Sequence, residues 1–384
     1  MRLYNKTGGI PLKALLRNTI FILCMLASGL VRSNQPLDAP VPLCIEVLPN
    51  GDVTIHWQQV ADPFGVFDHY SIHDAASGTE LGQVPGVGNT SFTVNGAGAN
   101  GASQSFYLYS RSNPVNVFDS QQGPTISSIY LQVNNPNNGT ALLSWNKPFS
   151  AGFVPAGTGS YFRIYKESPP GTWSLIDSVA YSATPAYTDT IYTCNGQVNY
   201  RIELVNSTGC TSVSNVDGDV FVDILPPYSP DFVQVTVDTA TGHAVLNWDQ
   251  NQAPDTEGYI ILQNIPGSGW IPIDTVYGIA NTTYTNTNGD ANASSELYTI
   301  AAIDDCWTGV PLSPNTSPAG DQHRTIFLEG TTDMCARTIT LQWNEYENWT
   351  AGVNRYEVYI SSGGPFTMEA SLPAGTNSHT TGVL

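Results

Sequence analysis

The chain has 384 residues and a mass of 41.3 kDa, which is too long for one β-sandwich and suits three modules plus part of a fourth. Its 13 basic and 32 acidic side chains give a formal net charge of −19, which repels phosphate backbones and argues against nucleic acid as a partner. Only 12% of the residues are charged, a composition typical of chains with many loops and polar strand faces.

The N-terminal segment has the pattern of a secretory signal peptide. Its four basic residues are Arg2, Lys6, Lys13 and Arg17. The apolar run that follows, Thr19 to Ala27, is about half the roughly 20 residues that a membrane-spanning helix needs, and no other segment is longer. We therefore expect residues 1–33 to be a signal peptide with its cleavage region. The mature chain is then secreted or exposed at the cell surface, without a transmembrane segment.

After this segment, a short alternating strand that ends in tryptophan occurs four times. The four copies are Val53-Thr-Ile-His-Trp57, Ala141-Leu-Leu-Ser-Trp145, Ala244-Val-Leu-Asn-Trp248 and Ile339-Thr-Leu-Gln-Trp343. Successive tryptophans are separated by roughly 90 to 100 residues, the length of a small β-sandwich. The repetition predicts that these four tryptophans are core residues of one repeated module.

An aromatic-x-aliphatic triplet follows each tryptophan by about a dozen residues, and alternation places its two apolar side chains on one face of a strand. The triplets are Tyr70-Ser-Ile72, Phe162-Arg-Ile164, Tyr259-Ile-Ile261 and Tyr356-Glu-Val358. A later strand repeats the rule in three units, as Phe106-Tyr-Leu108, Tyr200-Arg-Ile202 and Tyr298-Thr-Ile300. Gly-rich and Asn-Gly turns separate these strands, which predicts an all-β protein with an incomplete fourth unit.

These strand patterns resemble fibronectin type III domains over most of residues 38 to 384. The resemblance implies tandem, immunoglobulin-like antiparallel β-sandwiches. More narrowly, the segments from Cys44 to Trp57 and from Cys335 to Tyr346 resemble repeats of large Bacteroidetes surface proteins. Those proteins commonly end in a gliding-motility-associated or type IX secretion sorting domain, which this sequence does not contain.

Proline-rich linkers and the return of the strand pattern predict the module boundaries. The clearest linker is Leu225 to Pro230, because its prolines stiffen the connection. The expected modules are 38–122, 123–225, 226–322 and an incomplete 323–384.

Five cysteines lie outside the signal: Cys44, Cys194, Cys210, Cys306 and Cys335. An odd number leaves at least one unpaired in a monomer. Cys194 and Cys210 flank one strand, so they lie at opposite ends of a sandwich and are too far apart to pair. A bridge across a module junction, Cys194 with Cys306, is one hypothesis among the pairings that stay open.

The sequence has none of the motifs His-Glu-x-x-His, Gly-x-Ser-x-Gly, Cys-x-x-Cys or a Gly-rich phosphate loop. We therefore expect no catalytic residue, no cofactor and no enzymatic activity. His69 and His73 share a strand face and offer two metal ligands without a third, so a solvated strand face is the competing interpretation. Asp217-Gly-Asp219 and Asp304-Asp305 are the candidates for calcium, with ordinary loop solvation as the alternative.

Aromatic residues outside the repeated strands are the best indication of binding. Trp173 and Trp270 occupy equivalent places in their repeats and are assigned to edge packing. Trp307 and Trp349 fall in expected loops at the ends of their sandwiches, where an indole can stack on a sugar or anchor a protein. They are the candidate ligand contacts, for an extracellular polysaccharide or a surface protein, and packing between modules is the alternative.

The resemblance and the signal predict a non-catalytic, secreted or surface-attached protein. Its modules would act as spacers and as a binding surface, in adhesion or a gliding-related surface function. The alternative is an accessory spacer or carbohydrate-binding region of a larger extracellular hydrolase, with its catalytic domain beyond Leu384.

Overall fold

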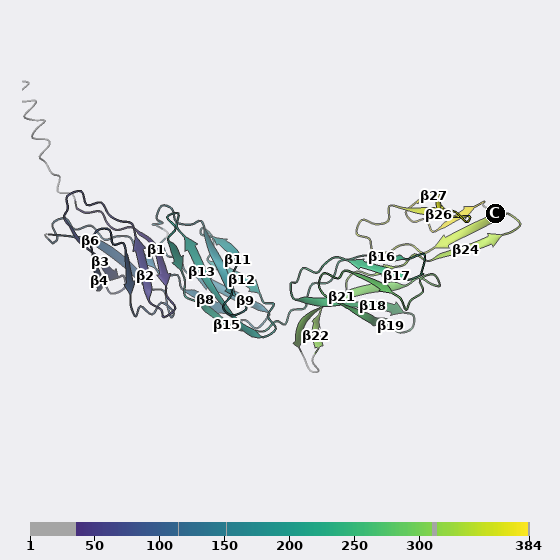
Figure 1. Ribbon diagram of the computed structural model, residues 1–384, viewed down its shortest axis with the longest axis horizontal. Coiled ribbons are helices and arrows are strands. Elements are labelled where there is room, and N and C mark those ends of the chain that lie inside the picture. The colour runs from purple at the N-terminus through teal and green to yellow at the C-terminus, as the bar shows by residue number, and fades with distance from the viewer. Residues whose placement is uncertain (1–35, 114, 151, 309–312, 383–384) are drawn as a thin grey trace, which may run out of the picture. The chain divides into compact units, whose positions relative to one another are not determined.

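A computed structural model describes residues 36–113, 115–150, 152–308 and 313–382. The expected signal peptide, residues 1–33, lies outside the described residues. Every regular element in the described part is a β-strand, which confirms the all-β prediction (Figure 1). No helix long and apolar enough to cross a membrane occurs in these described segments.

The first repeat is an antiparallel sandwich. One of its sheets has the strand order β1-β2-β5 and the other has the order β4-β3-β6-β7. The strands are β1 (Pro42–Val47), β2 (Val53–Trp57), β3 (Phe67–Asp74), β4 (Glu80–Pro85), β5 (Ser91–Val94), β6 (Ser105–Ser112) and β7 (Ile126–Ser127). This division into a three-stranded and a four-stranded sheet is that of a fibronectin type III sandwich, so the predicted fold class is confirmed.

The second repeat has the same plan. Its strands are β8 (Leu131–Asn134), β9 (Thr140–Trp145), β10 (Tyr161–Glu167), β11 (Trp173–Ala180), β12 (Ala186–Thr190), β13 (Gly196–Val205), β14 (Thr211–Val213) and β15 (Asp217–Phe221). One sheet has the order β12-β9-β8, and the other contains β11-β10-β13-β14 with β15 also paired to β13.

The first two repeats share a sheet. Strand β14 pairs in parallel with β1, which gives the continuous order β11-β10-β13-β14-β1-β2-β5. The backbone N–H of Ile45 donates to Ser212 Oγ at 3.1 Å beside this pairing. A disulfide joins Cys44 to Cys210 at a Cα separation of 5.8 Å. Backbone pairing and a covalent bond therefore tie the second repeat to the first.

The third repeat is again a complete sandwich. Its strands are β16 (Phe232–Val237), β17 (Ala244–Trp248), β18 (Thr256–Ile265), β19 (Gly269–Tyr277), β20 (Thr283–Asn286), β21 (Leu297–Thr308), β22 (Ser313–Thr316) and β23 (His323–Arg324). The sheet orders are β16-β17-β20 and β19-β18-β21-β22, with β23 also paired to β21.

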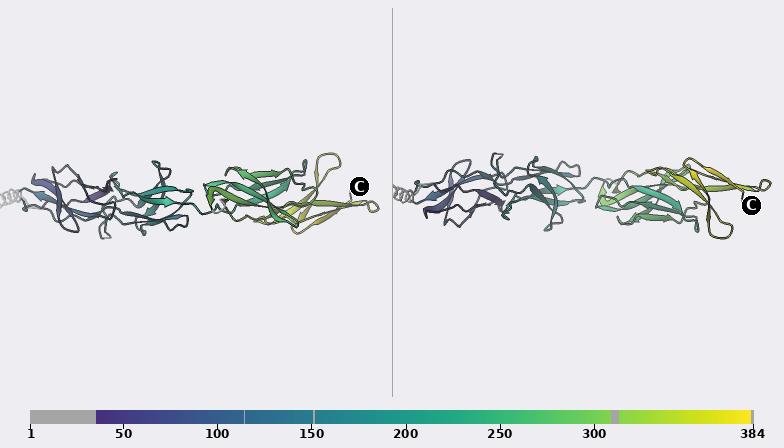
Figure 2. Two further views of the ribbon diagram at one scale, coloured as in Figure 1. Left: turned by 90° about the horizontal axis from the view of Figure 1, so that it is seen from below. Right: turned by 90° about the horizontal axis from the view of Figure 1, so that it is seen from above.

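The fourth repeat has five described strands. They are β24 (Leu328–Asp333), β25 (Thr338–Trp343), β26 (Arg355–Ile360), β27 (Thr367–Pro373) and β28 (Ser378–Thr381). The sheet β24-β25-β28 corresponds to the three-stranded sheet of the other repeats, whereas β26 and β27 form a pair. The strands of the third and fourth repeats can be followed from green to yellow in both views of Figure 2.

One β-bulge recurs at the same place in all four repeats. It follows the aliphatic residue of the aromatic-x-aliphatic triplet, between Ile72 and His73 in the first repeat and between Val358 and Tyr359 in the fourth. The second and third repeats have it after Ile164 and Ile261. Because a bulge changes which side chains face the core, its recurrence shows that the four repeats share one register.

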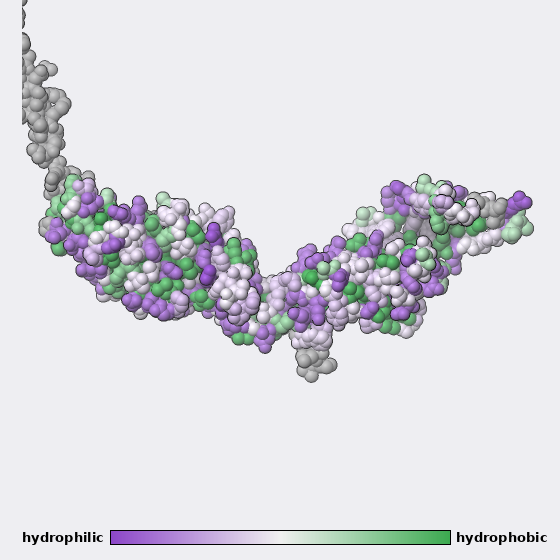
Figure 3. Space-filling model, viewed as in Figure 1, coloured by the Kyte–Doolittle hydropathy of each residue, from purple (hydrophilic) through white to green (hydrophobic). Residues whose placement is uncertain are grey.

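The repeated tryptophans lie in the cores of the complete sandwiches. Trp57, Trp145 and Trp248 are 2%, 6% and 3% exposed, and Trp343 is partly exposed. Each packs on the aromatic residue of the following triplet, with ring centroids 5.1 to 5.7 Å apart. On the face drawn in Figure 3, hydrophobic and hydrophilic residues are interspersed, as the low charge content leads one to expect.

The Cα packing separates the chain into two compact units. One holds the described residues up to 133 together with 143–187 and 199–218, and the other holds 134–142, 188–198 and the described residues from 219 onward. The second unit contains the disulfide Cys194–Cys306, with a Cα separation of 4.9 Å, which confirms that pairing hypothesis. Cys335 is free and exposed.

Candidate ligand-binding cleft between the third and fourth repeats

Tyr346 anchors the fourth repeat to the third. It lies three residues after Trp343, and its ring is 8% exposed. Its phenol oxygen accepts the backbone N–H of Val235 at 2.8 Å and lies 3.1 Å from His323 Nδ1. The ring also belongs to the core cluster of the third repeat, which contains Trp248.

The two side chains of this anchor are uncharged. Burial lowers the pKa of His323 and raises the pKa of Tyr346, so both groups are neutral near pH 7. Tyr346 Oη accepts from Val235 and shares a second hydrogen bond with Nδ1 of the neutral imidazole, in which the tautomer of His323 decides the donor. Two buried side chains and one amide are therefore joined in a single chain of hydrogen bonds.

Trp349 rests on this anchor. Its ring centroid lies 4.2 Å from that of Tyr346 at an interplanar angle of 30°, and Trp349 is 39% exposed. The Gly352 N–H donates to the Trp349 carbonyl at 2.7 Å and closes the turn that carries the indole. A buried ring thus holds one face of the indole, while more than a third of the side chain stays open to solvent.

A cleft of about 590 Å³ opens beside the indole. Its walls include three exposed carboxylates, Asp231, Asp249 and Asp321, together with Trp349 and Asn348. No lysine or arginine is among the described residues that line it. A partly exposed indole surrounded by hydrogen-bond acceptors can stack on a sugar ring and bind its hydroxyl groups.

The two candidate tryptophans lie in different places. Trp307 lies near the end of strand β21 rather than in a loop, opposite Pro314 of β22, and it is 58% exposed. The strand continues past the expected loop because β22 pairs with it up to Thr308. Trp307 does not line the cleft, so the structure does not bring it together with Trp349.

A buried acidic cluster surrounds the disulfide of the second unit. Asp223 and Asp304 are both 0% exposed, and their carboxylate oxygens lie within 4.8 Å of each other and of Cys306 Sγ. Burial and the neighbouring Asp223 raise the pKa of Asp255 to about 7. Burial also raises the pKa of Asp304, although it accepts hydrogen bonds from the Cys306 N–H and Asn315 Nδ2, each at 2.9 Å.

Three carboxylates of the calcium candidates, Asp217, Asp219 and Asp304, accept hydrogen bonds from N–H groups of the protein. Asp304 is held as described above, and Asp217 accepts the Val133 N–H at 2.7 Å. Asp219 accepts the N–H of Val220 at 2.8 Å. Cys306 is in a disulfide and offers no thiolate. A calcium site stays a prediction at both places.

The histidine pair on β3 has other partners. His69 Nδ1 lies 2.7 Å from Asp68, and His73 Nε2 lies 2.6 Å from Ser71 Oγ. The second ring nitrogen of His73 is 3.1 Å from the Gly78 carbonyl. His73 is only 8% exposed and stacks on Tyr107 at 5.2 Å, so the expected solvated strand face is wrong for this residue. A metal site at the pair stays a prediction.

The sequence analysis did not identify Tyr346 or His323 as contact residues. One signal was present, since Phe149 follows Trp145 by four residues and packs into the core of the first repeat. An aromatic residue just after the tryptophan strand therefore marks contact with the preceding repeat. Asp255 and Asp223 could not have been paired in the same way, because they lie in unrelated segments.

The strand order and the anchored cleft define an array of fibronectin type III-like sandwiches. No protein-family model matches the chain, and no curated protein matches it. Among solved structures, the FN1–FN3 domains of chicken CNTN1 match at 12% identity, over 75% of this chain and 98% of that chain, with a TM-score of 0.22. The central fibronectin-III array of RIM-binding protein matches at 14% identity, over 75% and 97%, with a TM-score of 0.23. The fold assignment rests on the strand order described above.

Proposed function

We propose that the chain is a secreted or cell-surface, non-catalytic array whose repeats act as spacers and present the Trp349 cleft to an extracellular polysaccharide. The observation that carries the proposal is the supported indole, with Tyr346 packed behind it at 4.2 Å and three carboxylates around it. The resemblance to Bacteroidetes surface repeats extends the proposal to adhesion or a gliding-related function.

Two features support the spacer role outside the cell. The disulfides Cys44–Cys210 and Cys194–Cys306 connect successive repeats, and such bonds persist in oxidising compartments. Domains of one chain usually move relative to each other. The two disulfides and the β14–β1 pairing restrict such motion between the segments that they join. Cross-links of this kind suit a spacer role outside the cell.

The charge of the cleft narrows the ligand class. Three carboxylates and a chain charge of −19 repel uronic-acid and sulfated polymers. Neutral sugars keep both the stacking contact and the hydroxyl donors for Asp231, Asp249 and Asp321. We therefore expect a neutral glucan or xylan to bind and an anionic polymer such as alginate to be rejected.

Affinity electrophoresis of the mature chain through gels containing laminarin, xylan or alginate tests the proposal. Trp349→Ala should weaken retardation by a neutral polymer by roughly tenfold or more. Trp307→Ala is the matched control, because this indole is exposed and lies outside the cleft. Loss of binding in Trp307→Ala alone would move the site to the β21–β22 hairpin. Retention by no polymer would favour a surface protein as the partner.

The release of reducing ends distinguishes the hydrolase alternative from the proposed non-catalytic array. An accessory region of an extracellular hydrolase would use the same cleft for its substrate. Protein isolated from its native host would then release reducing ends from the polymer that it binds, whereas the proposed array would bind without cleavage.

A further inference from the structure

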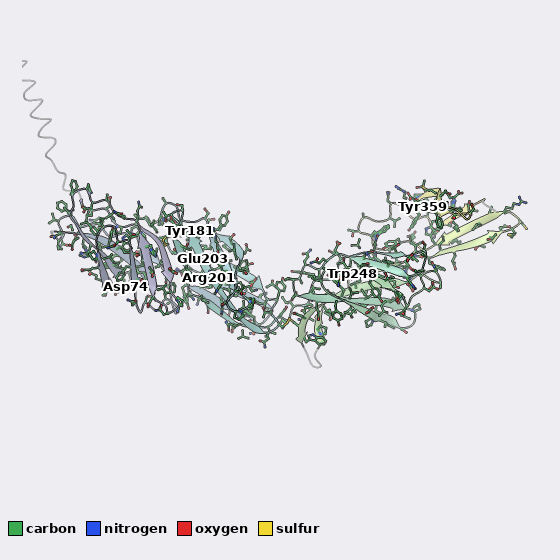
Figure 4. All side chains as sticks on the ribbon, viewed as in Figure 1. Asp74, Tyr181, Arg201, Glu203, Trp248 and Tyr359 are labelled. Carbon is green, nitrogen blue, oxygen red and sulfur yellow. A yellow bond between two sulfur atoms is a disulfide. The ribbon has the colours of Figure 1, made fainter. Side chains whose placement is uncertain are left out.

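Nearly all of the third repeat lacks lysine and arginine. The sequence has neither residue between Arg201 and Arg324, a stretch that contains strands β16 to β22. Figure 4 labels Arg201 and also Trp248, which lies within this stretch. Both arginines are already paired, Arg201 with Glu203 at 3.0 Å and Arg324 with Glu347 at 3.2 Å. A carboxylate buried in this stretch therefore has no basic side chain nearby in the sequence to neutralise it.

Three carboxylates of this stretch gather beside the disulfide Cys194–Cys306. Asp223 and Asp304 are both 0% exposed, and an oxygen of each lies within 4.8 Å of the other and of Cys306 Sγ. The carboxyl group of Asp255 is partly exposed and lies within hydrogen-bond reach of Asp223. Among the described residues, none of the three forms an ion pair. Buried charges are normally paired with an opposite charge or bound to a metal ion, so this cluster requires a cation.

Two carboxylate oxygens of the cluster have no hydrogen-bond donor in the described part of the chain. Asp255 Oδ1 is buried without a partner. Asp223 Oδ1 accepts the Leu225 N–H at 2.9 Å. Asp223 Oδ2 lies 4.0 Å from Cys306 Sγ, but a disulfide sulfur has no hydrogen to donate. Two ionised carboxylates cannot donate to each other either, so a cation would satisfy both of these oxygens.

The protein's own donors hold the carboxylates in place without using all of their acceptor positions. The Cys306 N–H and Asn315 Nδ2 each donate to Asp304 at 2.9 Å. A carboxylate oxygen has two lone pairs, so Asp304 keeps positions for an ion, and metal-binding carboxylates are commonly oriented by such hydrogen bonds. Oxygens that bind one Ca²⁺ at about 2.3–2.6 Å lie at most about 5 Å apart. The spacing of 4.8 Å or less between Asp223 and Asp304 meets this condition.

We propose that Asp223, Asp255 and Asp304 form a binding site for one calcium ion. Carboxylate oxygens are the ligands that Ca²⁺ prefers, and water would complete its shell of about six to eight oxygens. Cys306 is in a disulfide and supplies no thiolate, which disfavours zinc. Because Asp255 is partly exposed, the ion can enter from its side. The ion would link the segment after β15 to β21 beside the disulfide, and the site does not depend on the Trp349 cleft.

Calorimetric titration of residues 34–384 with CaCl₂ tests the proposal. Bound cations are first removed with EDTA, and the titration is run at about pH 7.5, where the ligands are largely deprotonated. One calcium ion should bind per chain, and saturating calcium should raise the unfolding temperature. MgCl₂ should bind at least about tenfold more weakly, because Mg²⁺ demands a near-ideal octahedron and gives up its water reluctantly.

Asp223→Asn is the decisive variant. Its amide oxygen can still accept the Leu225 N–H, while one negative charge is lost. Calcium affinity should fall by about tenfold or more. In EDTA, however, the variant should unfold at the same temperature as the unsubstituted chain or at a higher one, because repulsion between the carboxylates is reduced. A purely structural role of Asp223 would instead lower the unfolding temperature in EDTA and in calcium alike.

Two matched substitutions serve as controls. Asp219→Asn changes an exposed carboxylate of β15, and Asp249→Asn changes one that lines the Trp349 cleft. Both should bind calcium like the unsubstituted chain. Asp255→Asn, at the partly exposed ligand, repeats the test if Asp223→Asn does not unfold cooperatively in EDTA, and it should also weaken binding.

Four results would overturn the proposal. The first is no calcium binding, which would leave Asp223 and Asp255 to share a proton alone. The second is undiminished binding in Asp223→Asn and Asp255→Asn. The third is loss of binding in Asp219→Asn or Asp249→Asn instead, which would place the ion on β15 or in the cleft. The fourth is equal affinity for magnesium, which contradicts the assignment to calcium.

Discussion

The phenol oxygen of Tyr346 lies 2.8 Å from the backbone nitrogen of Val235 and accepts its hydrogen bond across the junction of the third and fourth repeats. The same oxygen meets His323 Nδ1 at 3.1 Å. Because the ring that makes these contacts also supports Trp349, the junction and the candidate binding cleft depend on one side chain. Changes at Tyr346 should therefore affect stability and ligand binding together.

Replacing Tyr346 by phenylalanine keeps the ring and removes the acceptor. The Val235 amide is then buried without a partner, which costs about 1 to 3 kcal/mol in the free energy of unfolding. Urea denaturation measures this loss of stability, and hydrogen exchange of the β16 and β23 amides shows whether it is located at the junction. Tyr359→Phe is the matched control, since Tyr359 is exposed and should change stability by less than about 0.5 kcal/mol. Equal losses in the two variants would contradict the anchor role.

The stability of the second unit should fall as pH rises from about 4 to about 7. Burial first, and then Asp223, raise the pKa of Asp255 to about 7, well above its ordinary value of 3.8. Below the ordinary value both states are protonated. As pH rises above about 4, Asp255 loses its proton in the unfolded chain but keeps it in the folded chain, so the free energy of unfolding falls. The fall stops near pH 7, where Asp255 also ionises in the folded chain.

Asp255→Asn should flatten this pH dependence, because the amide cannot ionise. Thermal unfolding of the variant and the unsubstituted chain between pH 4 and pH 8 measures the difference. Glu257→Gln changes a carboxylate two residues along the chain and serves as the control. A variant profile that falls as steeply as that of the unsubstituted chain would show that Asp255 does not cause the slope.

The disulfide Cys194–Cys306 should contribute strongly to stability. It joins residues with a sequence separation of 112, and removing a native disulfide typically costs about 2 to 5 kcal/mol. We expect Cys194→Ser with Cys306→Ser to lower the unfolding temperature of the second unit. Cys335→Ser, at the exposed free thiol, should leave it unchanged. Thiol titration of folded residues 34–384 should detect Cys335, and this signal should be absent in Cys335→Ser.

Truncating the repeated tryptophan should have unequal effects in the third and fourth repeats. Trp248 is 3% exposed inside a complete sandwich, so Trp248→Ala should cost about 3 to 5 kcal/mol. Trp343 is partly exposed beside an open edge, and Trp343→Ala should cost about half of that or less. Hydrogen exchange of β17 and β25 in the two variants provides the comparison. A larger loss of stability for Trp343→Ala than for Trp248→Ala would contradict this prediction, and it would mean that the Trp343 side chain is buried in solution.

The sequence by itself determined the strand-level architecture. In β2, Val53, Ile55 and Trp57 are buried while Thr54 and His56 are less so, and this alternation is visible without coordinates. Because a strand has a period of two, a slip of one residue would expose the whole apolar set, so the pattern specifies both the strand and its register. The repetition of the pattern then predicts tandem sandwiches.

Only the tertiary structure decided which distant residues meet. The partner of Cys44 is Cys210 because β14 pairs in parallel with β1, a contact across 166 positions that no local pattern encodes. In the same way, Asp223 and Asp255 come together only through the packing of separate segments, and Trp349 forms a cleft only because Tyr346 reaches the third repeat. Local side-chain periodicity determines strands and their faces, whereas contacts between repeats depend on how whole sandwiches pack against each other.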